Sequence, residues 1–315
     1  MDARAAALAA GENPEGTFTL FSSTNGDDGY YSCQYVPNVE YATHDGQSLK
    51  LQIIKPAFFS GKLPLVVFVQ GSAWRQQELY ANIPNLCTLA ARGYVVASVE
   101  YRDTDIARHP AQIEDAKAAI RFLRANADSY CVDPARVAIW GDSSGGHVAL
   151  MVGLSTGKFK NAIHPEQPDD VLAVVDFYGI TDIAKLGQHN EVLDHDSADS
   201  PEALLIGGAV PHNRAKADAA SPINWIPDGD TPPILMVHGD CDGIVHVSQS
   251  IVFYKAMMQA GKRVTFCKVS GGDHGLGIWN RDVLDLVNKF LMATLKAPAA
   301  PVSYTHLAGD SQMTL

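Results

Sequence analysis

Short apolar runs alternate with segments of helical periodicity along most of this chain, and this alternation constrains its fold more than any other feature. The first run, residues 65–69, is apolar at every position, as expected of a strand buried on both faces of a sheet. Similar runs follow at residues 94–99, 137–140, 172–177, 234–237 and 264–269. Helical segments lie between most of them, at residues 78–92, 111–127, 144–154, 247–260 and 279–295. The alternation predicts an α/β fold with a mostly parallel sheet, right-handed crossovers and helices on both faces.

A hairpin is predicted before the first of these runs. Residues 38–43 and 48–55 have strand-like patterns and flank an Asp45-Gly46 dipeptide, which is a strong signal for a tight turn. The two hairpin strands and the six apolar runs together predict a sheet of eight strands. Pro84 lies inside the helical segment 78–92, where we expect a kink or a break.

The chain has 315 residues, enough for two domains at about 150 residues each, but we predict one catalytic domain at residues 36–296. Residues 179–231 interrupt the alternation with a polar stretch and one short helical piece near 201–206. An insertion after the carboxyl end of a strand overhangs the ligand crevice of such a sheet, so a small cap is expected here. We expect residues 1–35 to be a peripheral segment and residues 297–315 to be a disordered tail.

Charge and cysteine content narrow the class of function. The net charge is −11, and an acidic surface repels phosphate backbones and anionic lipids, so we expect no nucleic-acid or membrane partner. The five cysteines are scattered, without a CxxC pair or a Cys/His cluster, which predicts reduced thiols and no metal site. The first residues lack the basic start and apolar core of a secretory signal, so we expect a cytoplasmic location.

The sequence Gly-Asp-Ser-Ser-Gly at residues 141–145 fits the pattern G-x-S-x-G. It follows a predicted strand and precedes a predicted helix, the context in which a nucleophilic serine sits on a sharp turn. Ser143 holds the central position, so we predict that it is the nucleophile. Ser144 then places its backbone N–H beside the nucleophile, as half of an oxyanion hole. Chymotrypsin-like proteases have similar letters around their serine, but they are all-β proteins with the order His, Asp, Ser, so we reject that interpretation.

An acid and a base can be assigned downstream of this serine, in the order Ser, Asp, His. Asp242 lies in the loop after the apolar run 234–237, where a carboxylate can orient an imidazole. Asp240, in the same loop, is the alternative and is more typical of a turn. His274 lies in a Gly-flanked loop after the last apolar run. We therefore predict Ser143, Asp242 and His274 as the catalytic residues, working without a metal or an organic cofactor.

The rest of the oxyanion hole is expected after the first apolar run, where the chain reads Gln-Gly-Ser-Ala-Trp at residues 70–74. Backbone N–H donors survive a change from glycine to serine if the local φ is allowed for other residues. We therefore expect Ser72 or Ala73 to act as a donor together with Ser144. Two interpretations of Trp74 carry equal weight: it closes the substrate pocket, or it anchors the loop as a core aromatic residue. The pocket residues expected beside Trp74 are Tyr178 and Trp225.

Taken together, these motifs make the chain resemble α/β-hydrolase esterases, close to the branch of bacterial acetyl xylan and feruloyl esterases and related small-acyl carboxylesterases. Supporting segments lie at residues 113–123, 132–137 and 200–208, and the resemblance covers about residues 36–296. It implies an α/β-hydrolase fold and a serine carboxylesterase that acts on short-acyl esters, with acetyl or feruloyl esters of carbohydrates among them. The chain departs from the pattern at Gln70, where His is usual, and at Ser72, where Gly is usual.

Two other classes of function fit the same residues. An amide hydrolase or peptidase on this fold, of the arylformamidase or prolyl-oligopeptidase type, shares the triad order. The second type usually has a long β-propeller before the hydrolase domain, whereas only about 35 residues precede the hairpin here. A non-catalytic ligand-binding homologue is supported only by the unusual residues 70–72. A small-molecule ester is the expected partner.

Overall fold

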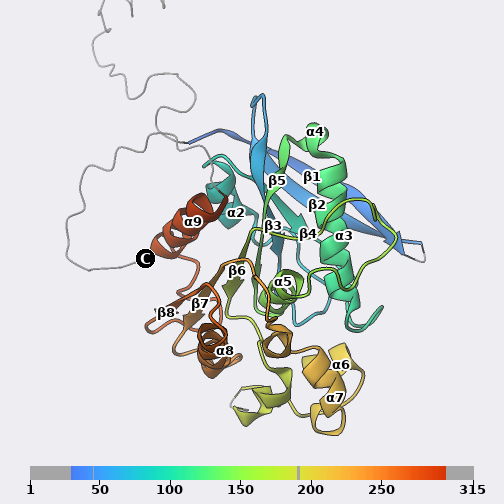
Figure 1. Cartoon of the computed structure of the whole chain (residues 1–315), viewed down its shortest axis with the longest axis vertical. Coiled ribbons are helices and arrows are strands. Elements are labelled where there is room, and N and C mark those ends of the chain that lie inside the picture. Colours follow the sequence, from blue (N-terminus) through green and yellow to red (C-terminus); the bar gives the residue numbers. More distant parts are fainter. Residues whose placement is uncertain (1–29, 45, 190–191, 296–315) are drawn as a thin grey trace, which may run out of the picture.

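The computed structural model describes residues 30–44, 46–189 and 192–295. Their strands form one eight-stranded sheet in the order β1-β2-β4-β3-β5-β6-β7-β8 (Figure 1). The pairs β1–β2 and β2–β4 are antiparallel, and every other pair is parallel. The strands are β1 (Cys33–His44), β2 (Gln47–Pro56), β3 (Leu63–Val69), β4 (Val95–Val99), β5 (Val132–Asp142), β6 (Ala173–Phe177), β7 (Ile234–Gly239) and β8 (Val264–Val269). The sheet confirms the predicted eight strands and their mostly parallel arrangement.

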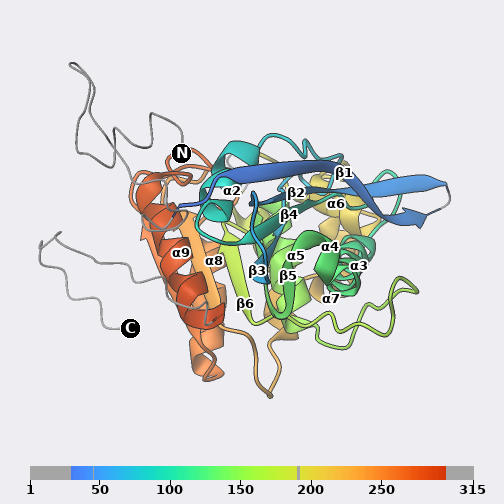
Figure 2. The same ribbon diagram turned by 90° about the horizontal axis from the view of Figure 1, so that it is seen from above.

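Helices cover both faces of this sheet (Figure 2). One face packs against α2 and α9 through side chains such as Phe68 and Trp140. The other face packs against α3, α5 and α8 through side chains such as Val67 and Ile139. Successive side chains of a strand point to opposite faces of the sheet. Because helices cover both faces, every residue of β3 is buried. The helices outside the cap are α2 (Ile83–Ala90), α3 (Ala111–Ala125), α4 (Ala127–Tyr130), α5 (Ser144–Leu154), α8 (Ser248–Gln259) and α9 (Arg281–Leu295).

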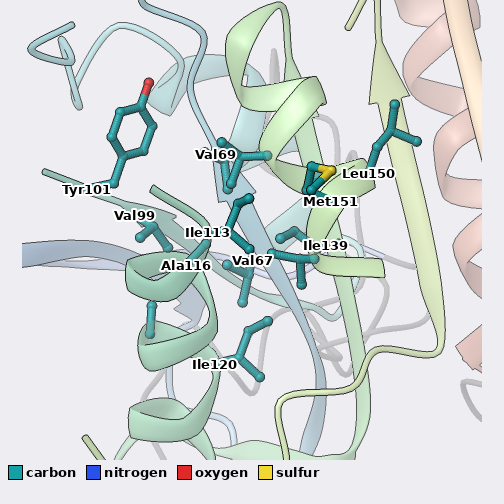
Figure 3. Close-up of a cluster of buried hydrophobic side chains, with 14 of the residues drawn as sticks. Val67, Val69, Val99, Tyr101, Ile113, Ala116, Ile120, Ile139, Leu150 and Met151 are labelled. Carbon is teal, nitrogen blue, oxygen red and sulfur yellow. The ribbon is translucent and has the colours of Figure 1, made fainter. Parts of the chain in front are cut away.

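The core between the sheet and the helices α3 and α5 positions the end of β5. Figure 3 shows Val67 and Ile139 of two neighbouring strands close to Ile113 and Ile120 of α3 and to Met151 of α5. Helix α5 is buried at every residue and therefore has no solvent-facing stripe. Its burial holds its N-terminus at the carboxyl end of β5.

The insertion after β6 forms a small cap next to the carboxyl ends of the parallel strands (Figure 1). It contains η1 (Ile183–Gln188), α6 (Pro201–Ile206), η2 (Val210–His212), α7 (Arg214–Ala219) and η3 (Pro222–Trp225), which is more helix than the one piece predicted. Ser200 caps α6, since its hydroxyl accepts a hydrogen bond of 3.1 Å from the N–H of Ala203. Gln249 of α8 ties the start of the cap to the core, because its amide oxygen accepts from the N–H groups of Thr181 and Asp182.

Three cationic side chains of α3 hold the long segment between α5 and β6. Lys117 donates to the carbonyl oxygens of Ser155 (2.6 Å) and Lys158 (2.9 Å). Arg121 binds the carboxylate of Asp169 at 2.9 Å. Arg124 donates to the carbonyl oxygens of Pro168 and Asp170 in this segment, and also to that of Pro134 in β5. These donors satisfy backbone carbonyls of an irregular segment that packs against the core.

Several expected boundaries differ from the structure. Strand β1 begins at Cys33 rather than at residue 38, and it pairs with β2 from Cys33 opposite Pro56. Pro84 lies in the first turn of α2, so the helix starts there and is not broken, because a first-turn residue has no intrahelical use for its N–H. The predictions for residues 1–29 and 297–315 lie outside the described residues. Among the described helices, none combines the length and apolar character that crossing a bilayer requires.

Candidate active site

Ser143 lies on a sharp turn between β5 and α5. Its backbone has φ 53° and ψ −125°, a left-handed conformation that is strained for a residue with a side chain. The turn needs glycine on both sides: a Cβ on Gly141 would lie 2.1 Å from the carbonyl oxygen of Gly145, and one on Gly145 would lie 2.0 Å from that of Val69. The turn presents the Ser143 hydroxyl at the N-terminus of α5, where helix dipoles favour negative charge.

Ser143, His274 and Asp242 form a continuous hydrogen-bond chain. The Ser143 hydroxyl donates to Nε2 of His274 at 2.9 Å, and Nδ1–H of His274 donates to Oδ2 of Asp242 at 2.8 Å. The other oxygen of Asp242 accepts from the N–H groups of Ile244 (2.9 Å) and Val245 (2.8 Å). The structure thus brings together the three residues that the sequence singled out from three separate loops.

A second histidine supports the acid. Nε2 of His238 lies 3.2 Å from Oδ2 of Asp242 and 2.7 Å from the carbonyl oxygen of Val245. Its Nδ1 lies 2.7 Å from the Ser250 hydroxyl, so the ring fits a donor at Nε2 and an acceptor at Nδ1. Burial alone would raise the pKa of Asp242, but the hydrogen bonds from His238 and His274 outweigh burial and hold this pKa well below its usual range.

Tyr178 packs against the imidazole of His274, with the two ring centres 4.8 Å apart and the rings tilted by 60°. Its hydroxyl donates to Oδ2 of Asp142 at 3.2 Å and accepts from the indole N–H of Trp279 at 2.8 Å. Burial raises the pKa of Asp142 to about 6, although bonds from the Gly71 N–H and from Tyr178 oppose it. Tyr178 therefore connects Asp142, the residue before Ser143, with the imidazole ring of His274.

The loop after β3 lies beside Ser143 and is held by the two residues that flank it. The N–H of Gly71 donates to Oδ1 of Asp142 at 2.9 Å, and the N–H of Ser72 donates to the Ser144 hydroxyl at 2.9 Å. Among the described residues, no hydrogen-bond acceptor faces the N–H groups of Ala73 and Ser144. These two N–H groups are free to face an oxyanion, whereas that of Ser72 is engaged. The structure therefore corrects the expectation that Ser72 is an equivalent donor.

Comparison with known proteins identifies a family for this chain. A profile of the family described as BD-FAE matches residues 51–257, which is well over half of the chain. The chain belongs to the BD-FAE family. The matched range contains Ser143 and Asp242 and ends before His274.

Relatives of this BD-FAE chain include named esterases. The chain is 31% identical over 222 residues to the esterase LipC of Mycobacterium tuberculosis (strain ATCC 25618 / H37Rv), covering 68% of this chain and 53% of LipC. It spans about half the length of the curated relatives it matches. A truncated carbohydrate esterase from gut microbiota is 29% identical with a TM-score of 0.73, covering 87% of this chain and 99% of that one. Est2 of Thermogutta terrifontis, solved with butyrate bound, is 25% identical with a TM-score of 0.69, covering 87% and 97%. These likenesses confirm the α/β-hydrolase fold.

Two aromatic residues expected at the pocket of this BD-FAE chain lie in different surroundings. Trp74 is 1% exposed, and its indole N–H donates to Nδ1 of His147 at 3.1 Å, so it anchors the loop in the core, as the alternative interpretation had it. Burial lowers the pKa of His147 to about 3, which suits an imidazole that accepts this bond. Trp225 is partly buried, packs against Phe159 and donates its indole N–H to the carbonyl oxygen of Ala219 at 2.8 Å. The pocket role expected for Trp74 is therefore corrected, because its ring is buried in the core, whereas the pocket role of Trp225 stays a prediction.

Gln70 and Ser72, the two departures from the family pattern, are accommodated differently. Ser72 has no positive φ, so a serine is unstrained at this position. Its hydroxyl donates to the carbonyl of Arg75 at 2.6 Å and lies 2.9 Å from the hydroxyl of Tyr101. The amide nitrogen of Gln70 reaches Asn82 at 3.5 Å, whereas its buried amide oxygen has no partner among the described residues.

His238, Tyr101 and Gln77 were missed as supports of the site. Gln77 donates to the carbonyl oxygens of Gln70 and Val99 and accepts from the N–H of Tyr101, which fastens the loop to β4. The only signal in the sequence that could have identified these residues was their position, since each lies within eight positions of a strand end. No group of His, Cys, Asp or Glu in the described parts of the chain is arranged to hold a metal ion.

Proposed function

We propose that this chain is a serine carboxylesterase that uses Ser143 as nucleophile, His274 as general base and acid, and Asp242 as the orienting acid. The observation that carries the proposal is the hydrogen-bond chain from the Ser143 hydroxyl through His274 to Asp242, with contacts of 2.9 Å and 2.8 Å. A nucleophile and base within hydrogen-bond reach, with the base oriented by a third group, is the arrangement that covalent catalysis needs. The named esterases among the relatives support the same reaction class.

The proposed reaction follows from the positions of these atoms. Nε2 of His274 accepts the hydroxyl proton as Ser143 Oγ attacks the carbonyl carbon of the ester. The N–H groups of Ala73 and Ser144 stabilise the negative oxygen of the tetrahedral intermediate. His274 then gives the proton to the departing alkoxide, leaving an acyl-serine. Water attacks the acyl-serine with His274 again as base, which releases the acid and restores Ser143.

Short-acyl, water-soluble esters are the proposed substrates, with acetyl or feruloyl esters of carbohydrates among them. The butyrate found in Est2 and the carbohydrate esterase from gut microbiota support a small acyl group and a sugar alcohol. The cap contributes the carboxylates of Asp194, Asp196 and Asp199 rather than a long apolar lid. A lipase that docks on lipid droplets needs an exposed apolar surface, which such a cap does not supply.

A chain-length series tests this substrate class. We expect kcat/KM for p-nitrophenyl esters to be highest between acetate and butyrate and to fall toward decanoate, with activity on acetylated xylan or methyl ferulate. A maximum at octanoate or longer, or a jump in rate at the micelle concentration, would favour a lipase. Faster hydrolysis of a matched p-nitroanilide would favour an amide hydrolase.

An active-site probe tests the nucleophile. A fluorophosphonate should label the wild-type chain at Ser143, and labelling should vanish in Ser143→Ala. We expect the same variant to lose about three or more orders of magnitude in kcat, with only residual catalysis from the oxyanion hole and binding. Absence of labelling in an active wild-type chain would contradict the assignment.

A further inference from the structure

Both side chains next to Ser143 bind the loop that follows β3. Oδ1 of Asp142 accepts from the N–H of Gly71, and the Ser144 hydroxyl accepts from the next N–H along the chain, that of Ser72, each at 2.9 Å. Two consecutive peptide planes of the loop are thus fastened to the residues on either side of the nucleophile. The next N–H, that of Ala73, is the first one left for an oxyanion.

The loop beyond this attachment is strained. Ala73 and Trp74 both have φ 55°, and neither is glycine. Such left-handed residues persist only when their surroundings fix them. The surroundings here are the Trp74 indole bonded to His147 on one side and the Ser72 N–H bonded to Ser144 on the other. The strained Ala73 peptide lies between these two attachments.

The Ser144 hydroxyl belongs to a buried polar cluster. Ser144 is fully buried, and the Tyr101 hydroxyl, which is also buried, lies 2.9 Å from the Ser72 hydroxyl. The Ser72 hydroxyl in turn closes a turn by donating to the carbonyl of Arg75. A buried acceptor that meets a partly buried N–H in this way favours one geometry, since breaking the bond would leave the buried Ser144 hydroxyl without this donor.

We propose that Ser144 is a positioning residue that acts through its hydroxyl: it holds the Ser72 N–H so that the Ala73 N–H faces the oxyanion. The inference rests on the proposed esterase function and deepens it. Ser144 thereby contributes twice, with its backbone N–H as a donor in the hole and with its side chain as the attachment of the opposite donor. Substrate in its ground state does not need this alignment, whereas the tetrahedral intermediate does.

Ser144→Ala isolates the hydroxyl, because alanine keeps the backbone N–H and adds no bulk. We expect kcat on p-nitrophenyl acetate to fall about tenfold with KM changed less than about twofold, since the loss falls on the transition state. The inhibition constant of a trifluoromethyl ketone, which binds serine as an oxyanion, should rise by a similar factor. Ser144→Thr, which keeps a hydroxyl on the same carbon, should recover most of the lost kcat.

Ser155→Ala is the matched control. Ser155 is a buried serine just after the other end of α5, and its hydroxyl donates to the carbonyl of Met151. The Ser155→Ala variant should retain the wild-type kcat and the wild-type affinity for the trifluoromethyl ketone. A Ser144→Ala variant with unchanged or higher kcat would overturn the proposal, and a higher value would mean that the hydroxyl withholds the Ser72 N–H from the hole. An equal loss in Ser155→Ala would also overturn it.

The same measurements separate this inference from the proposed function. If the wild-type chain hydrolyses no ester and Ser143 does not react with a fluorophosphonate, the esterase proposal fails and the inference falls with it. If the wild-type chain is active and Ser144→Ala matches it, only the role of the hydroxyl is wrong.

Discussion

Three carboxylates at the ends of β5, β6 and β7 differ in how their charge is compensated. Asp242 receives two backbone N–H bonds and two histidines, and its pKa is held well below the usual range although burial opposes this. Asp142 receives the Gly71 N–H and the Tyr178 hydroxyl, and burial raises its pKa to about 6. Asp176 receives the Gly179 N–H, its other oxygen has no partner among the described residues, and burial raises its pKa to about 7. The pKa thus rises as the number of donors falls.

The raised pKa of Asp176 predicts that the free energy of unfolding depends on pH. A carboxyl group whose pKa is raised from 3.8 to about 7 binds more protons in the folded chain than in the unfolded one between these values. The free energy of unfolding therefore falls as pH rises through this window. Asp176→Asn, which keeps an acceptor for the Gly179 N–H, should raise the melting temperature at about pH 8 and change it less at about pH 4. Thermal melts across pH would refute this if the two chains differed equally at both ends.

At the scale of elements, the cations of α3 act as a clamp on an irregular segment. Lys117 and Arg121 are buried and share the carboxylate of Asp169, at 3.6 Å and 2.9 Å. Arg121 also donates to the carbonyl of Ile163 at 2.8 Å. Burial lowers the pKa of Lys117, although Asp169 opposes this. The clamp joins α3 to the segment that leads from α5 into β6.

Arg121→Met should destabilise the protein strongly. It keeps the apolar bulk but leaves Asp169 with one cation and the Ile163 carbonyl without its donor, so a loss of about 3 kcal/mol in unfolding free energy is expected. Arg214→Met is the control, because Arg214 and Asp218 form an exposed pair on α7 worth about 0.5 kcal/mol or less. Urea unfolding measures both values. Equal losses would show that the buried cluster contributes no more than a surface pair.

A buried ion pair joins the cap to the loop after β7, which carries Asp242. Nδ1 of His195 lies 3.2 Å from Oε2 of Glu202 on α6, and Nε2 lies 3.0 Å from the carbonyl oxygen of Ile244, two residues after Asp242. Burial alone would lower the pKa of His195, but Glu202 and the Ile244 carbonyl outweigh it and raise this pKa. The protonated ring therefore stabilises the fold below the ordinary pKa of histidine, and this contribution is lost as pH rises through the raised value.

Glu202→Gln should expose this pH dependence. The variant removes the charge that favours protonated His195, so it should lower the melting temperature at about pH 6 and change it much less at about pH 9. Limited proteolysis should show the same trend within the cap. A loss that is equal at both pH values would contradict a role for the charge and leave packing as the cause.

At the scale of the whole molecule, the sheet and the three residues of the hydrogen-bond chain were predictable, because both follow from order along the chain. Apolar runs buried on both faces identify the strands, and loops after the carboxyl ends of parallel strands meet at one edge. The bond between Ser72 and Ser144 was not predictable, since it depends on one hydroxyl orientation across 72 positions. Of the short cap helices only α6 was predicted; others such as α7 were missed, because helices this short are held by tertiary contacts rather than by their own periodicity.

The net charge of −11 sets the last prediction. An acidic molecule repels an anionic ester before contact, and salt screens this repulsion over about 10 Å at 0.1 M. For an anionic substrate such as p-nitrophenyl hemisuccinate, kcat/KM should rise about threefold or more between about 10 mM and about 300 mM salt. The neutral p-nitrophenyl butyrate should change little, because it feels no net force from the charge. If both esters responded alike, salt would be acting on the fold or the chemistry rather than on the encounter. A fall for the anionic ester would instead indicate a local cationic patch that outweighs the overall charge.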